Sequence, residues 1–124
     1  MPDDGPDLWH PTDDDTVETA EAAYNDYTLL KSELMSLYDE FDKLTKKAPN
    51  NRLSPLALET VNALIGDAKA LLGGDRYVDR VSQFVAAGET PQNSDVLLVL
   101  ATLVKALARF REVWWHIWDD LEIT

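Results

Sequence analysis

The stretch from Ser94 to Leu121 limits what this chain can fold into more than any other part of the sequence. Its apolar residues recur at alternating steps of four and three, the spacing of one continuous seam on an α-helix. The seam consists of Val96, Leu100, Leu103, Leu107, Phe110, Trp114, Ile117 and Leu121. A second apolar row lies beside it, and a helix keeps so wide an apolar face only by burying it against other helices. We therefore expect the central helix of a small all-α protein.

A second seam of the same kind runs through residues 15–48. Its members, at the same alternating steps, are Ala20, Ala23, Tyr27, Leu30, Leu34, Leu37, Phe41, Leu44 and Ala48. Asp15 with Glu18 resembles a helix-capping pair at the start, and Pro49 ends the pattern because proline cannot continue a helix. At about 1.5 Å per residue this helix is roughly 50 Å long, which is long for a chain of 124 residues.

Two shorter helices are expected between the long ones. Ser54 and Pro55 form a clear start, because serine caps free N–H groups and proline suits the first helical position. Gly73-Gly74 then ends this helix. A further short helix is expected from about Asp75 to Ala87, where Gly88 ends it.

The start of the last helix is open between two candidate pairs, Thr90-Pro91 and Ser94-Asp95. Loops of a few residues favour antiparallel neighbours. The sequence therefore predicts an all-α fold, an antiparallel four-helix bundle in which the first and fourth helices are long and heptad-patterned and the other two are shorter. Leu29 and Leu98 lie on the otherwise polar sides of the long helices, where they would suit extra contacts.

The charge of the chain is concentrated at its N-terminal end. The net charge is −12, and residues 1–26 hold nine acidic residues and no base. The first residues also carry helix-breaking prolines, so we expect an acidic flexible tail over residues 1–14 and a helical bundle domain over residues 15–124. An acidic surface repels nucleic acid, so direct nucleic-acid binding is not expected.

The chain contains no cysteine, which excludes a disulfide framework and thiolate metal sites. The longest charge-free apolar run near the C-terminus, Val96 to Val104, is far shorter than the ~20 residues that a membrane helix needs. The N-terminus lacks the basic, apolar pattern of a signal peptide. We expect a cytoplasmic protein without membrane contact, and no motif calls for a metal or a cofactor.

Two parts of the sequence are candidates for binding a partner. In the tail, Leu8 and Trp9 form an apolar pair between acidic runs, which either packs loosely on its own domain or docks into a groove of a partner. At the end of the last helix stand Arg111, Trp114, Trp115, Trp118 and Leu121. Tryptophan and arginine are enriched in binding hot spots, and the other interpretation of the cluster is a buried core. Acidic residues oppose the helix dipole at this end, so we expect residues 121–124 to fray.

Arg109 and Arg111 stand before His116 at a spacing that resembles the loose Arg-x4–6-His pattern of HEPN ribonucleases, which are small all-α domains. The resemblance covers eight residues at most. It implies metal-independent RNA cleavage, with Arg109, Arg111 and His116 as the catalytic candidates acting across a dimer. The position after the arginine, usually polar in that family, holds Phe110 or Glu112 here. The acidic charge of the chain argues against an RNA substrate.

The two long seams and the absence of a catalytic constellation favour a non-enzymatic helical interaction module, which would be a small subunit or adaptor of a larger complex. Its expected partner is another protein or a second copy of the chain. An acidic neutraliser, such as an antitoxin, an immunity protein or a nucleic-acid mimic, is the first alternative. A HEPN-like ribonuclease is the second.

Overall fold

The computed structural model describes residues 8–12, 16–84 and 90–123, and this part of the chain holds three α-helices. They are α1 (Val17–Lys47), α2 (Pro55–Leu72) and α3 (Asn93–Asp120), with a short 3-10 helix, η1 (Val78–Arg80), between α2 and α3. The all-α prediction is confirmed. The predicted helix from Asp75 to Ala87 is wrong for its described part, because η1 is the only helical turn there.

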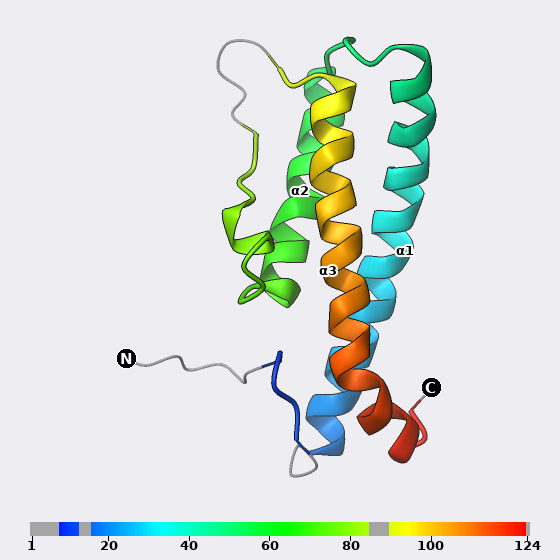
Figure 1. The fold of residues 1–124 in the computed structure, drawn as a ribbon, viewed down its shortest axis with the longest axis vertical. Coiled ribbons are helices and arrows are strands. Elements are labelled where there is room, and N and C mark those ends of the chain that lie inside the picture. The colour runs from blue at the N-terminus through cyan, green and yellow to red at the C-terminus, as the bar shows by residue number, and fades with distance from the viewer. Residues whose placement is uncertain (1–7, 13–15, 85–89, 124) are drawn as a thin grey trace.

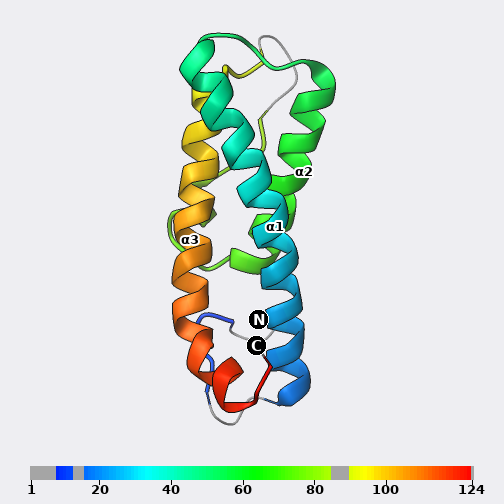
Figure 2. The same ribbon diagram turned by 90° about the vertical axis from the view of Figure 1, so that its right-hand side faces the viewer.

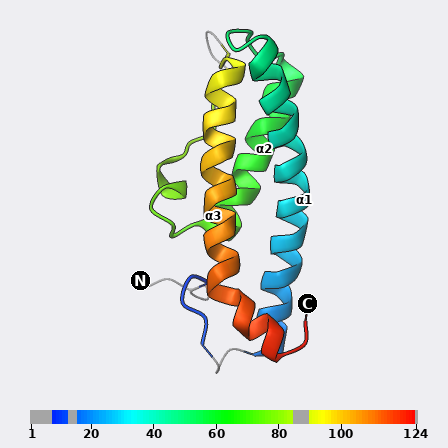
Figure 3. The ribbon, with the colours of Figure 1, turned by 45° about the vertical axis from the view of Figure 1, so that its right-hand side comes forward.

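The chain returns along the length of the molecule after α2. α1 runs antiparallel to both α2 and α3, which run in the same direction (Figure 1, Figure 2). Since α2 ends far from the point where α3 begins, a connection must run back between them. We call residues 73–84 of this connection the strap. The strap lies beside α2 on the side away from α1 (Figure 1, Figure 3).

The helices begin close to the predicted positions. The Thr16 hydroxyl accepts an N–H group of the first turn of α1 at 3.1 Å, whereas Asp15, the expected cap, lies outside the described residues. Ser54 caps α2 as predicted, at 3.2 Å. Neither expected pair starts α3: the helix follows Gln92, whose backbone N–H donates to the Asp95 carboxylate at 3.1 Å.

The interface between α1 and α3 ends in a cluster of aromatic rings. The seam of α3 is buried from Val96 to Ile117. Where α1 begins and α3 ends, the Trp118 ring lies 5.3 Å from Tyr27 and stacks on Trp114 at 5.9 Å between ring centroids. Ring pairs of this kind add about 0.5–1.5 kcal/mol each beyond the area they bury. This cluster therefore anchors the start of α1 to the end of α3.

The strap is not an α-helix because side chains supply partners for its backbone. The Asp75 carboxylate accepts two N–H groups of the residues that follow it. Asn62 of α2 binds both backbone groups of Phe84, accepting from its N–H at 2.8 Å and donating to its carbonyl at 2.9 Å. Lys69 of α2 donates to the carbonyl of Val81. These bonds replace the ones that a helix would make.

Candidate functional site

The tryptophan-rich end of α3 contributes two side chains to the core. Trp114 and Trp118 are both buried. Their indole N–H groups donate to backbone carbonyls far away in the sequence, Trp114 to Leu8 at 2.7 Å and Trp118 to Ala20 at 3.0 Å. A buried indole needs such a partner for its N–H group. These two candidate partner-binding residues are therefore occupied within the fold.

Three of the candidate residues at the end of α3 remain accessible, namely Arg111, Trp115 and Leu121. Trp115 is 46% exposed and Leu121 is 37% exposed, and Arg111 is exposed as well. Beyond Leu121 the chain turns back, and the N–H of Ile123 donates to the Trp118 carbonyl at 2.9 Å. Ile123 also packs against the core. The end of α3 is thus held up to residue 123, unlike the fraying expected from its charges.

The expected tail, residues 1–14, belongs only in part to the described structure. Residues 1–7 and 13–15 lie outside the described residues, so a flexible tail stays a prediction for them. Leu8 and Trp9 are described, and both pack against the hydrophobic core. We call these two residues the N-terminal clasp.

Trp9 fixes the clasp to two parts of the domain, α3 and the end of α2. Its ring meets Phe110 of α3 edge to face at 5.4 Å between centroids. Its indole N–H lies 3.3 Å from the carbonyl of Leu72 and 3.0 Å from that of Gly73. Gly74 has a φ of +105°, and a Cβ atom there would lie 3.0 Å from the Trp9 ring. Gly73 thus ends the helix, and Gly74 makes room for the indole.

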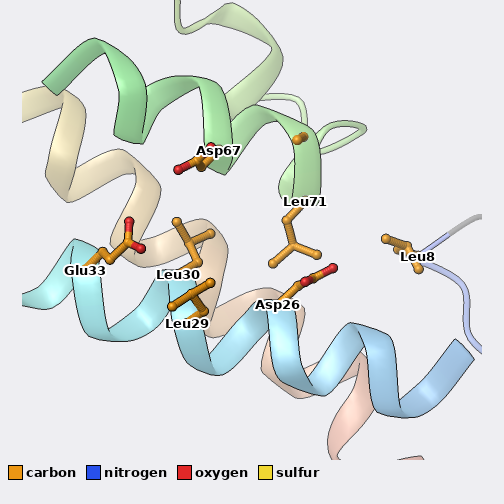
Figure 4. Close-up of a pocket in the computed structure, with 8 residues that line it drawn as sticks. Leu8, Asp26, Leu29, Leu30, Glu33, Asp67 and Leu71 are labelled. Carbon is orange, nitrogen blue, oxygen red and sulfur yellow. The ribbon is translucent and has the colours of Figure 1, made fainter. Parts of the chain in front are cut away.

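A groove runs between α1 and α2, and no residue of the strap lines it. It consists of two hollows of about 330 and 420 Å³ that share Glu33 and Asp67. We call it the α1/α2 groove. Buried leucines of both helices, among them Leu30 and Leu71, form its floor. Leu29 stands at its rim with 63% of the residue exposed (Figure 4).

Each described ionisable side chain that lines the α1/α2 groove is a carboxylate. Asp26 and Glu33 come from α1 and Asp67 from α2, and Glu33 and Asp67 project into the space between the two helices (Figure 4). Neither hollow has a lysine or arginine among its lining residues. Within the described ranges, no ion pair joins one of these carboxylates to a base. The groove therefore combines an apolar floor with a negative rim.

A second groove, of about 520 Å³, lies between α1 and the end of α3. We call it the aromatic groove. Helical geometry places its α1 residues on the side of α1 opposite the α1/α2 groove. Its aromatic and charged lining residues are Tyr24, Tyr27, Lys31, Arg111, Trp115, Trp118 and Asp119. Burial raises the pKa of the Tyr27 hydroxyl, and the nearby charge of Arg111 partly opposes that effect. This groove brings Arg111, Trp115 and Trp118 together, as the sequence pattern suggests.

The residues of the HEPN-like pattern do not share one environment. Arg109 is bound within the fold, because its guanidinium donates to the Asp75 carboxylate at 2.9 and 2.8 Å and lies 5.4 Å from the centre of the Tyr77 ring. His116 is exposed, and Arg111 lines the aromatic groove. Helical geometry places Arg109 and His116 on one side of α3 and Arg111 on another.

Replacing Asp75 by asparagine is expected to lower the free energy of unfolding by about 1–3 kcal/mol at neutral pH. Burial alone raises the pKa of the Asp75 carboxyl, but hydrogen bonds from Arg109 and from the N–H groups of Val78 and Tyr77 outweigh it, so the pKa lies below its usual value. The ionised form therefore stabilises the fold above about pH 4, and this contribution is lost as the pH falls through the lowered pKa.

Urea unfolding between pH 2 and pH 7 checks this expectation. The stability curves of the wild type and of Asp75→Asn should converge in acid, because both side chains are then uncharged. If the two stability curves stay parallel from pH 2 to pH 7, the ionised Asp75 carboxylate does not stabilise the fold as expected.

The α1/α2 groove is the part of the site that the sequence pattern does not reveal. Of its lining residues, only Leu8 is a partner-binding candidate from sequence. The one further signal is Leu29, an apolar residue on the otherwise polar side of its helix. Asp26, Glu33 and Asp67 look like ordinary solvated side chains, and only the packing of α1 beside α2 turns them into a rim.

Comparison with protein-family models, with curated proteins and with solved structures gives no match. Among the described residues, none of the helices has the length and apolar character needed to cross a membrane. The same residues include no group of three or more His, Asp or Glu side chains placed to hold a metal ion. The features of the described structure that indicate a function are the geometry and charge of the two grooves.

Proposed function

We propose that the protein is a non-enzymatic helical interaction module, a small subunit or adaptor of a larger complex, and that the α1/α2 groove binds a helix of its partner. The observation that carries the proposal is the position of Leu29. This residue is 63% exposed at the rim of a groove whose floor is already apolar. Covering a leucine and the apolar surface around it is favourable by roughly 25 cal/mol per Å² of area removed from water.

The packing of the chain supports a helix as the occupant. In a four-helix bundle, each helix has neighbours on both of its flanks. Here the segment that could have formed a further helix is the strap, which lies beside α2 away from α1 (Figure 3). Among the described residues, no further element therefore covers the face between α1 and α2. A partner helix there would supply in trans the fourth helix that the heptad patterns of the two long helices favour.

The aromatic groove offers the same partner a second contact surface. Trp115 is half exposed there beside Arg111, and these residue types are enriched where binding energy is concentrated. A partner that wraps around α1 would meet both grooves.

Replacing Leu29 by glutamate is expected to weaken partner binding at least about tenfold, or 1.4 kcal/mol. A carboxylate there would face an apolar floor and three like charges. The matched control is Leu98→Glu, which changes a leucine that is 71% exposed on α3 and lines neither groove. Both positions are exposed, so neither variant disturbs the core.

The measurement is affinity purification of the full chain and of both variants from lysate of the source organism, followed by titration of the purified partner. The partner should remain bound to the wild type and to Leu98→Glu and be lost from Leu29→Glu. Undiminished binding by Leu29→Glu would refute the assignment of the groove.

An acidic neutraliser that covers a basic surface is the second candidate, and the all-carboxylate rim of the α1/α2 groove favours it. Deletion of residues 1–7 separates the two functions. This deletion removes Asp3, Asp4 and Asp7 but keeps the N-terminal clasp. A neutraliser that acts through its acidic N-terminal residues should lose inhibition, and its binding should weaken steeply with salt. An interaction module that acts through the groove should keep its partner.

A further inference from the structure

We infer that the helix bound in the α1/α2 groove is cationic and amphipathic, with an apolar stripe flanked by lysine or arginine side chains. This inference rests on the proposed function and adds the chemistry of the partner to it. Three features of the groove carry it: the sign of its charges, their positions on both walls, and its length.

The charges that line the groove are of one sign, and no ion pair among the described residues neutralises them. Asp26 and Glu33 lie on the α1 wall and Asp67 lies on the α2 wall (Figure 4). None of the three has an ion-pair partner among the described residues. A neutral or acidic helix would bring no compensating charge to these carboxylates, whereas lysine or arginine at the edges of the helix would pair with both walls.

The length of the groove matches about three helical turns. Along α1 it extends from Asp26 to Leu37, which at about 1.5 Å per residue is roughly 16 Å. A helix of this length fills an apolar groove with residues at positions i, i+3 or i+4, and i+7. Asp26 and Glu33 are themselves seven residues apart, so bases two turns apart on the partner would face both. Leu8, whose carbonyl accepts the Trp114 indole N–H, stands at one end of the groove (Figure 4).

A second copy of the chain is a poorer occupant than a basic partner. Each copy carries a net charge of −12, so two copies repel each other. The densest group of bases, Lys43, Lys46 and Lys47, stands at the end of α1, where Asp42 already pairs with Lys46 at 3.0 Å. Among the three helices of the described residues, none therefore offers an apolar stripe flanked only by bases.

Two synthetic helical peptides of about 14 residues, with the same leucine stripe and either lysine or glutamate beside it, test the inference by calorimetric titration into the full chain. The lysine peptide should bind at least about tenfold more tightly than the glutamate peptide, and its affinity should fall as salt is added. The triple variant Asp26→Asn/Glu33→Gln/Asp67→Asn should bind the lysine peptide at least about tenfold more weakly than the wild type.

The matched control is Glu21→Gln/Glu112→Gln/Asp120→Asn. It removes three exposed carboxylates that line none of the hollows of the α1/α2 groove, and it changes the net charge by the same amount. Its affinity for the lysine peptide should stay within about threefold of the wild type. An equal loss in both triple variants would mean that the overall charge attracts the peptide, which would overturn the inference.

The remaining outcomes separate the inference from the proposed function. If the glutamate peptide binds as tightly as the lysine peptide and Leu29→Glu abolishes both, the groove is a docking site but its ligand is not cationic. A dimer in solution that Leu29→Glu dissociates would make a second copy the occupant, and would likewise overturn the inference. Failure of the proposed function is a distinct result, in which the natural partner binds Leu29→Glu as tightly as the wild type.

Discussion

Replacing Trp118 by alanine is expected to lower the free energy of unfolding by about 3–5 kcal/mol. The side chain is 1% exposed, packs against Tyr27 and Trp114, and donates its indole N–H to Ala20 at the start of α1. The substitution would leave a large cavity where α1 and α3 meet. Small domains have about 5–15 kcal/mol of stability, so this loss should be visible as a large shift of the urea midpoint followed by circular dichroism.

The control for Trp118 lies three positions earlier on the same helix. Trp115→Ala removes the same side chain from a site that is 46% exposed, so it should change stability by no more than about 1 kcal/mol. Trp118→Phe keeps a ring in the core but loses the N–H donor, and its effect should lie between the other two. Equal destabilisation by Trp118→Ala and Trp115→Ala would contradict the assignment of Trp118 to the core and of Trp115 to the surface.

Replacing Trp9 by alanine is expected to lower the free energy of unfolding by about 2–3 kcal/mol, somewhat less than for a fully buried tryptophan. The substitution removes the ring contact with Phe110 and the indole N–H that binds the end of α2. Trp9 joins the end of α2 to α3, so its loss should also make the amide hydrogens of the last turn of α2 exchange faster. Urea unfolding and hydrogen exchange are the two measurements.

Two truncations serve as controls for the clasp. Deletion of residues 1–7 removes three acids and keeps Leu8 and Trp9, so it should destabilise the protein less than Trp9→Ala does. Deletion of residues 1–12 removes the clasp and should destabilise the protein at least as much as Trp9→Ala. If the two truncations behave alike, the contacts of Trp9 contribute little in solution.

Sequence reasoning succeeds for the helices whose periodicity and end signals agree. Ser54-Pro55 and Gly73-Gly74 bracket α2 as predicted, and both long helices end within two residues of their expected limits. It fails at the strap, whose apolar residues also recur at helical spacing. Among the bonds that hold the strap, those from Asn62 reach Phe84, 22 residues away in the sequence. A local pattern carries no information about such a partner.

The candidate site was predictable only where a single helix defines it. The sequence brings Arg111, Trp115 and Trp118 close together, but which tryptophan is buried depends on α1. Ala20 and Ala23 are small and buried there, and the Ala20 carbonyl receives the Trp118 indole N–H. The α1/α2 groove depends on the alignment of two helices, which no single-helix pattern specifies.

The positions of the four tryptophans determine which part of the protein intrinsic fluorescence monitors. All four tryptophans lie near the end of α3: Trp114, Trp115 and Trp118 belong to its last two turns, and Trp9 packs against Phe110 of the same helix. Intrinsic fluorescence therefore senses that end, while far-ultraviolet circular dichroism senses every helical turn. If the opposite end, near the α1–α2 connection, opens first, helicity will fall before the emission changes. Coincident curves would instead identify the whole chain as one cooperative unit.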